Sequence, residues 1–456
     1  LVAWIFAGGS LAADRFAPHF SVDNSLMLAV LAQHFRWLQL DYRCRHLDDP
    51  DRHLEVVPAD NGVLLGRILS ILGAPRGVKA QLDDISLPAY LSVVNREHQR
   101  DFARVYLLNR NNNPEQLGSY IHSTRSEAHA HELQTLFASA TSGSATVGNQ
   151  SRVWVSSAAV SDLAGLDSER ARELSGNSDG EREQTRIRLR LATAALYGTL
   201  TPPTARAIAS TFRRTNTPGG YRYHQCYQAA RDCEESRATL AAKLGVSESA
   251  IQSWRRGQRP YVTNALEQAR ERGWCEPPTG SEMATALTAL LTWLLARGSL
   301  RETYYPVFGA STTAQRERFA TLADALSLSY EAVRPDDPGW PTELRPGEDG
   351  SLLGRVLYAV GVPRLGEPQT TAPIPPIAYQ DQRHAQQVAD IWCLHHAEMS
   401  GQGEKTTPFT ISVPPHAGEY FPGVLADLLS GQLNWTIEHP DSRKLVVADR
   451  PDDVIV

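Results

Sequence analysis

Long hydrophobic runs are absent from this 456-residue sequence. No apolar stretch approaches the roughly 20 residues that a membrane-spanning helix requires, and no basic start leads into an apolar stretch with a small-residue cleavage site. We therefore expect no membrane partner. Lysine is also scarce, because arginine supplies all but four of the 45 basic residues.

Paired cysteines are lacking as well. The five cysteines are Cys44, Cys226, Cys233, Cys275 and Cys393, an odd number without a CxxC pair. This spacing disfavours both a disulfide framework and a zinc ribbon. The sequence therefore predicts a cytoplasmic protein, associated with the nucleoid if its partner is DNA.

The negative charge is small and unevenly distributed. A net charge of −6 argues weakly against a nucleic-acid partner. Between Glu181 and Cys275, however, there are 16 Arg and Lys residues against 8 Asp and Glu. The middle of the chain is therefore basic and the remainder acidic.

What is present, above all, is an internal repeat. The segment LVAWIFAGGSL at 1–11 matches LLTWLLARGSL at 290–300, and GVLLGRILSILGAPRG at 62–77 matches GSLLGRVLYAVGVPRLG at 350–366. The two offsets, 289 and 288, agree over a long stretch of chain. Fixed-offset similarity indicates copies of one structural module, so the two ends of the chain are predicted to share a fold.

Each copy mixes helical and strand patterns. Apolar residues recur at three- and four-residue spacing in 62–72, which predicts a helix with one buried face. The run at 1–11 is apolar almost throughout and predicts a helix packed on all sides. Alternating patterns at 119–123, 152–155 and 409–413 predict half-buried strands, so the fold class is α+β.

These motifs resemble the LAGLIDADG homing-endonuclease family: an apolar helix ending in small-Gly-Ser, then an LLGRxLxxxGxPRG helix, then a Pro-containing stretch before another apolar helix. Weaker second motifs at 102–111 and 388–397 would make each module a pseudo-twofold unit. The resemblance implies two modules of helices on saddle-shaped antiparallel sheets, at 1–160 and 283–456.

In that family an acid before the final glycine of each central helix holds the divalent metal for hydrolysis. The matching positions here are Gly8, Arg110, Arg297 and His396. Magnesium sites are built on carboxylates, so we expect no metal, no cofactor and no cleavage by the family mechanism. Asp14 and Glu302, a few residues downstream, are the acids that could substitute. Members of the family without these acids include DNA-binding regulators, some joined to a helix-turn-helix, and RNA maturases.

A helix-turn-helix pattern lies between the modules, at 239–257. Apolar residues are spaced as in two short helices, with Gly245 at the turn, Ser247 as a cap and Gly257 at the end. The pattern resembles the repressor-type helix-turn-helix. An all-α domain is therefore predicted at 186–276, after a linker at 161–185 that is rich in Ser, Gly, Asp and Glu.

If the second helix enters the major groove, its outward side chains can read base edges. We predict that Ser249, Gln252, Ser253 and Arg256 do so. Other arginines are assigned to phosphate, which positions a protein without selecting sequence; they are Arg213, Arg214, Arg255 and Arg259. The alternative interpretation of the segment is a helical connector with a solvated basic face.

The sequence therefore predicts a sequence-specific, non-cleaving protein that binds double-stranded DNA, with a regulatory or architectural role. Two alternatives stay open. One is an active homing endonuclease with displaced acids, because the scaffold is preserved. The other is an RNA-binding maturase or a structural subunit of a larger nucleoprotein assembly, because the duplicated modules lack their acids.

Overall fold

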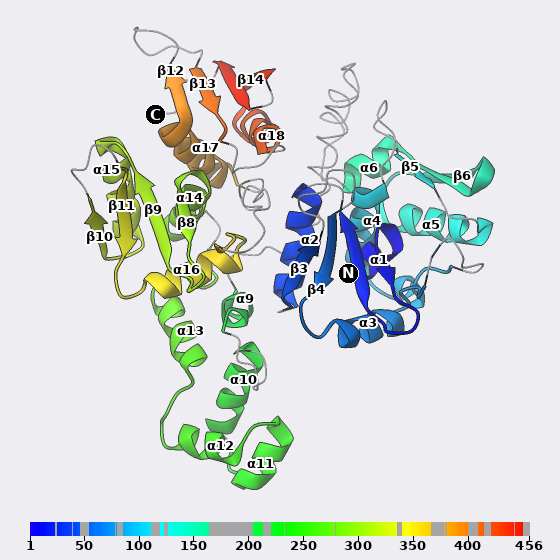
Figure 1. Ribbon diagram of the computed structural model, residues 1–456, viewed down its shortest axis with the longest axis horizontal. Coiled ribbons are helices and arrows are strands. Elements are labelled where there is room, and N and C mark those ends of the chain that lie inside the picture. Colours follow the sequence, from blue (N-terminus) through cyan, green and yellow to red (C-terminus); the bar gives the residue numbers. More distant parts are fainter. Residues whose placement is uncertain are drawn as a thin grey trace. The chain divides into compact units, whose positions relative to one another are not determined.

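The computed structural model describes residues 1–22, 25–38, 40–45, 54–77, 79, 85–110, 119–122, 126–163, 204–212, 220–231, 233–278, 280–334, 340–365, 378, 381–399, 409–414, 421–441 and 443–449. The chain divides into two compact units, Leu1–Thr199 and Leu200–Val456. Each unit is described here separately (Figure 1).

The first unit alternates helices with pairs of strands. Its first half consists of α1 Val2–Ala7, β1 Ser10–Leu11, β2 Pro18–Val22, α2 Ser25–Trp37, β3 Tyr42–Arg45, β4 Leu54–Pro58 and α3 Gly62–Ile71. Its second half consists of η2 Ala89–Ser92, α4 Arg96–Arg110, β5 Ser119–His122, α5 Glu127–Ala140, β6 Ala145–Gly148, η3 Asn149–Ser151, β7 Arg152–Val155 and α6 Ser157–Leu163.

The second unit begins with helices alone and then repeats the mixed pattern. The helices are α9 Ala205–Ser210, α10 Gly220–Arg231, α11 Arg237–Leu244, α12 Glu248–Arg255 and α13 Tyr261–Glu271. After them come α14 Glu282–Arg297, β8 Gly298–Leu300, β9 Pro306–Ala310, α15 Thr313–Ala325, β10 Tyr330–Val333, β11 Thr342–Pro346 and α16 Gly350–Ala359. The unit ends with α17 Gln382–His396, β12 Ala397–Met399, β13 Phe409–Ser412, α18 Phe421–Leu433, β14 Thr436–Asp441 and β15 Lys444–Asp449.

One strand order recurs among the described sheets, all of which are antiparallel. Three four-stranded sheets run β1-β2-β4-β3, β8-β9-β11-β10 and β12-β13-β15-β14, so in each the fourth strand lies between the second and the third. The three-stranded sheet β5-β7-β6 has the same order without a first strand. Each unit therefore contains two sheets of similar strand order, and the fold class is α+β, as the sequence predicts. The pseudo-twofold modules stay a prediction.

Helix pairs form the centre of the cores. α1 packs on α4 in the first unit, and α14 packs on α17 in the second. Every residue of α1 is buried, and Trp4, Trp293 and Trp392 are among the largest fully buried side chains. The prediction of an all-round packed helix at 1–11 is thus confirmed for Val2–Ala7.

Other predicted elements also form where the sequence places them. α3 and α16 are the two helices of the LLGR repeat, and β5, β7 and β13 are the three predicted strands. The weaker second motifs lie on α4 and α17. Local hydrophobic spacing is sufficient to define these elements, although α16 buries more of its surface than α3, which buries Leu65, Gly66 and Leu69.

The two units do not coincide with the three predicted domains. The helices of 205–271 share a unit with the second module, so the three-way division stays a prediction. Most of the predicted linker, 164–185, lies outside the described residues, and its first residues form the end of α6.

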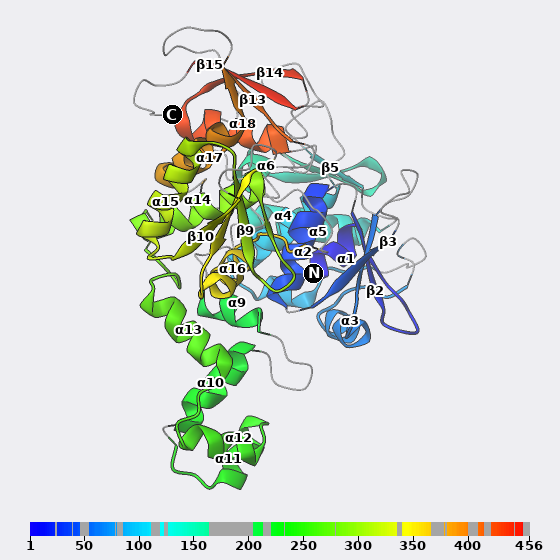
Figure 2. The same cartoon turned by 60° about the vertical axis from the view of Figure 1, so that its left-hand side comes forward.

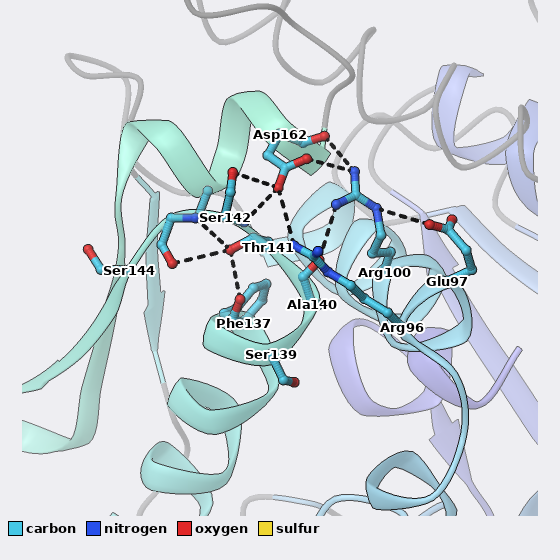
Figure 3. A network of polar contacts seen from close by, with 12 residues as sticks. Arg96, Glu97, Arg100, Phe137, Ser139, Ala140, Thr141, Ser142, Ser144 and Asp162 are labelled. Atoms are coloured by element: carbon cyan, nitrogen blue, oxygen red, sulfur yellow. Dashed lines mark hydrogen bonds and ion pairs between the residues drawn. The ribbon is translucent and has the colours of Figure 1, made fainter.

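A polar network joins the ends of three helices in the first unit (Figure 3). Asp162 of α6 accepts a hydrogen bond from Arg100 of α4 at 2.8 Å and one from the backbone N–H of Ser142, beyond α5, at 2.7 Å. Burial opposes ionisation of Asp162, but the bonds from Arg100 and Ser142 outweigh it and lower its pKa to about 2. The network therefore fixes α6 against α4 and α5. No helix among the described residues combines the length and apolarity of a membrane span.

Candidate nucleic-acid interface

Two short capped helices lie where the sequence predicts them. α11 begins after Ser236, whose Oγ accepts a hydrogen bond from the N–H of Thr239, and α12 begins after Ser247, whose Oγ accepts one from the N–H of Ala250. Gly245 ends α11 with a φ of 69°, a left-handed conformation that glycine adopts without strain. The turn between the helices therefore depends on the left-handed backbone of Gly245 and on the cap formed by Ser247.

A compact aromatic core holds α12 in place. Ile251 and Trp254 of α12 are buried against Leu240 of α11. The rings of Tyr223 and Tyr227, both from α10, meet Trp254 edge to face at 5.1 and 6.0 Å. Edge-to-face pairs of this kind add stability beyond the area they bury, so α10, α11 and α12 form one packed unit.

The four predicted base-reading residues occupy a single stripe. Ser249, Gln252, Ser253 and Arg256 follow the i, i+3, i+4, i+7 spacing of one helix face. Ser249 and Arg256 are exposed, and Gln252 and Ser253 are half-buried. Within the described residues, Arg256 makes no ion pair, so its guanidinium is free to contact a ligand.

The arginines assigned to phosphate differ in their surroundings. Arg255 donates hydrogen bonds to the carbonyl oxygens of Cys233 and Glu235, each at 2.7 Å. Arg259 pairs with Glu267 at 2.5 Å. Arg213 and Arg214 lie outside the described residues. All four phosphate assignments stay predictions. Arg255 and Arg259 also have partners within the protein.

Arginines also fix these helices to the rest of the second unit. Arg355 of α16 donates to the carbonyl oxygen of Thr211 at 2.6 Å, and its guanidinium lies between the rings of Phe212 and Tyr304, at 4.0 and 4.1 Å. Arg272, just after α13, forms an ion pair with Asp349. Figure 2 shows α9 and α13 beside α16, with α11 and α12 at the far end of the helical arm, defined as residues 204–276. The arm thus presents α12 away from the strands.

The positions predicted to lack acids, Gly8, Arg110, Arg297 and His396, lie at the ends of the central helices, where basic side chains contact carbonyl oxygens. In the first unit, Lys79 donates hydrogen bonds from Nζ to the carbonyl oxygens of Ile5 at 2.8 Å and Phe6 at 3.1 Å, at the end of α1 and next to Gly8. Burial, together with the charge of Arg110, lowers the pKa of Lys79 to about 7. The end of the central helix is therefore occupied by an amine that is only partly protonated at neutral pH.

The second unit has an equivalent arrangement built from different residues. His396, at the end of α17, lies with Nε2 3.2 Å from the carbonyl oxygen of Ala296, next to Arg297. Its neighbour His395 meets the ring of Trp293 edge to face at 4.6 Å. Burial, followed by the charges of His396 and Arg297, lowers the pKa of His395 to about 3.

The possible substitute acids are surface residues. Asp14 pairs with Arg15 at 3.3 Å, and 75% of the Asp14 side chain is exposed. Glu302 is also exposed. Across the described part of the chain, no three His, Cys, Asp or Glu side chains gather as metal ligands would.

Sequence reasoning did not identify Lys79, His395 or Arg355 as important. The scarcity of lysine could have drawn attention to Lys79, and the LLGR repeat already contains Arg355. Lys79 contacts a residue 74 positions away along the chain, and Arg355 contacts one 144 positions away. No local sequence pattern therefore reveals what these two side chains contact.

Comparisons with known proteins find a distant likeness among solved structures. No family model matches the sequence, and no curated protein matches it. Among solved structures, the crystal structure of the N-terminal LAGLIDADG domain of DUF199/WhiA aligns with a TM-score of 0.25 and 15% sequence identity, covering 42% of this chain and 85% of that chain.

Proposed function

We propose that this chain is a sequence-specific DNA-binding protein that reads the major groove with α12 and does not cut DNA. The observation that carries the proposal is the stripe of Ser249, Gln252, Ser253 and Arg256 on a helix whose opposite face is locked by Trp254. A rigid helix that offers amide and guanidinium groups on one face is suited to bidentate contacts with base edges.

The α11–turn–α12 segment acts in this proposal as a helix-turn-helix. Its caps, its left-handed glycine and its shared aromatic core support that role. The contacts of Arg355 and Arg272 with the rest of the second unit also support this role. A helix that recognises base edges must be held in a fixed orientation relative to its scaffold.

The scaffold in this proposal consists of two modules of the LAGLIDADG type. The support comes from the repeated strand order and from the central helix pairs α1–α4 and α14–α17. At the ends of these helices Lys79 and His396 contact carbonyl oxygens. The amine of Lys79, with its pKa near 7, is partly protonated at neutral pH, and the protonated form repels a metal ion electrostatically. This supports binding without hydrolysis.

The open sheet faces of the second unit favour the arm as the site that contacts DNA. On β11, Glu343 alternates with the buried residues Thr342 and Leu344. Glu331 on β10, Glu398 on β12 and Glu438 on β14 are exposed. Arg345 on β11 is paired with Glu343. Carboxylates repel phosphate, whereas DNA binding depends on neutralising it.

The proposal is tested by selecting bound sequences from a random duplex pool and then measuring the dissociation constant for selected and scrambled duplexes. Arg256→Ala is expected to reduce the ratio of these constants by roughly 5- to 150-fold, corresponding to about 1–3 kcal/mol for one bidentate base contact. The matched control is Arg206→Ala, which removes an exposed arginine from α9 of the same arm and is expected to leave the ratio unchanged. Equal ratios for the wild-type protein and Arg256→Ala would contradict the assignment of α12.

A further inference from the structure

The repeated helices α3 and α16 each pack closely on the backbone of an equivalent loop. A Cβ atom on Gly66 of α3 would clash with the carbonyl oxygen of Phe16, and one on Gly354 of α16 would clash with that of Tyr304. Phe16 and Tyr304 both have positive φ, 52° and 64°. These helices therefore approach the same strained loop in both units.

Paired arginines cover both loops. In the first unit the guanidinium groups of Arg67 and Arg76 lie 5.8 and 4.9 Å from the ring of Phe16. In the second unit Arg355 and Arg364 lie 4.1 and 4.8 Å from the ring of Tyr304. Arg67 corresponds to Arg355 at the offset of the repeat, so the two helices present an equivalent face to whatever packs outside them.

That outer face is buried in one unit and exposed in the other. On α16, Leu352, Val356 and Ala359 are 7%, 0% and 9% exposed. Their counterparts on α3, Leu64, Ile68 and Ile71, are 58%, 45% and 84% exposed. Contiguous exposed apolar side chains of this size usually mark a binding site.

The cover on α16 is α9 and the residues after it. α9 packs on α16, Thr211 accepts the hydrogen bond of Arg355, and Phe212 stacks on the same guanidinium. α9 is apolar on its buried side, where Ala205, Ile208 and Ala209 lie. Within the described part of the first unit, Arg67 has no carbonyl partner and no second ring.

We propose that the α3 face, defined as Leu64, Arg67, Ile68 and Ile71, binds a short helix of a partner protein. This helix would have apolar side chains toward α3, a terminal carbonyl oxygen for Arg67 and an aromatic ring just beyond it. A symmetric contact with a second copy is disfavoured, because it would bring two Arg67 guanidinium groups together. The arm of this chain is already engaged by α16.

The test supplies such a helix in the correct geometry. Because Leu290 corresponds to Leu1 in the repeat, a second copy of residues 204–289 is joined directly ahead of Leu1 of the full chain. Amide hydrogen exchange in 63–72 is expected to slow at least tenfold relative to the unextended chain. Arg67→Ala is expected to abolish the protection, and Arg76→Ala, the matched control, to retain it. Unchanged exchange in 63–72 with a protected added arm would overturn the proposal.

A second measurement does not depend on folding of the added segment. A peptide of residues 204–212 is titrated into the unextended chain, and the methyl resonances of Ile68 and Ile71 are expected to shift while that of Ile251 stays constant. The absence of any shift at millimolar peptide would overturn the proposal. So would a dimer of the unextended chain that Ile68→Glu dissociates, because the face would then serve a second copy.

Discussion

Nζ of Lys79 lies 2.8 Å from the carbonyl oxygen of Ile5, at the end of the central helix α1. The last carbonyl groups of a helix have no partner within the helix, and a positive charge there interacts favourably with the helix dipole. Lys79 therefore completes the end of α1 with hydrogen bonds from its amine, which carries its full charge only below neutral pH because its pKa is about 7.

Removing the amine of Lys79 should destabilise the first unit. Lys79→Met is expected to lower the free energy of unfolding by about 1–3 kcal/mol, because it leaves buried carbonyl oxygens unsatisfied. Urea denaturation followed by circular dichroism measures the change. The control is Lys444→Met on the exposed start of β15, for which a change within about 0.5 kcal/mol is expected. Equal stability of the Lys79 variant and the control would show that Lys79 does not cap α1.

The aromatic core of the arm should be essential for presenting α12. Trp254→Ala is expected to cost about 3–5 kcal/mol because it leaves a cavity between α10 and α12. Hydrogen exchange in 237–255 should rise, and selected duplexes should no longer be bound. Trp340→Ala is the matched control, because Trp340 is 66% exposed and its removal should change neither property. Retained DNA binding by the Trp254 variant would separate the packing from the function.

The attachment of the helical arm to α16 should depend on Arg355. Arg355→Ala removes two ring contacts and the hydrogen bond to Thr211, which together are expected to contribute about 1–3 kcal/mol. Limited proteolysis should then cut the chain near 211–220 sooner. Arg67→Ala is the equivalent change in the first unit and should leave cleavage of the arm unchanged. If both variants are cut at the wild-type rate, Arg355 does not hold the arm.

Acid should destabilise the second unit through His395. Burial lowers the pKa of His395 to about 3, below the ordinary value of about 6.5 that applies to the unfolded chain. Between these two values the unfolded state binds more protons, so this contribution to stability is complete above pH 6.5 and is lost as the pH falls toward 3. His395→Phe keeps a ring against Trp293 and should flatten the decline between pH 6.5 and 4. A wild-type decline in the variant would assign the acid sensitivity to other groups.

The structure agrees with the sequence-based predictions where neighbouring residues alone determine the local conformation. The caps at Ser247 and the turn at Gly245 need only neighbouring residues, and both were predictable. The roles of Lys79 and Arg355 depend on partners far along the chain. Likewise, α3 and α16 share six of their ten residues. In the described part of the chain α9 packs on α16, whereas the outer face of α3 is exposed. Burial of their outer faces is a property of the neighbour, which periodicity within the helix cannot reveal.

The central claim is that the chain holds duplex DNA without cutting it. The most direct test titrates one selected duplex, labelled on both strands, in EDTA and in Mg²⁺ at matched ionic strength, recording anisotropy and strand integrity in the same samples. The account predicts the same dissociation constant in both conditions and intact strands throughout. Strands cleaved only when Mg²⁺ is present would contradict it.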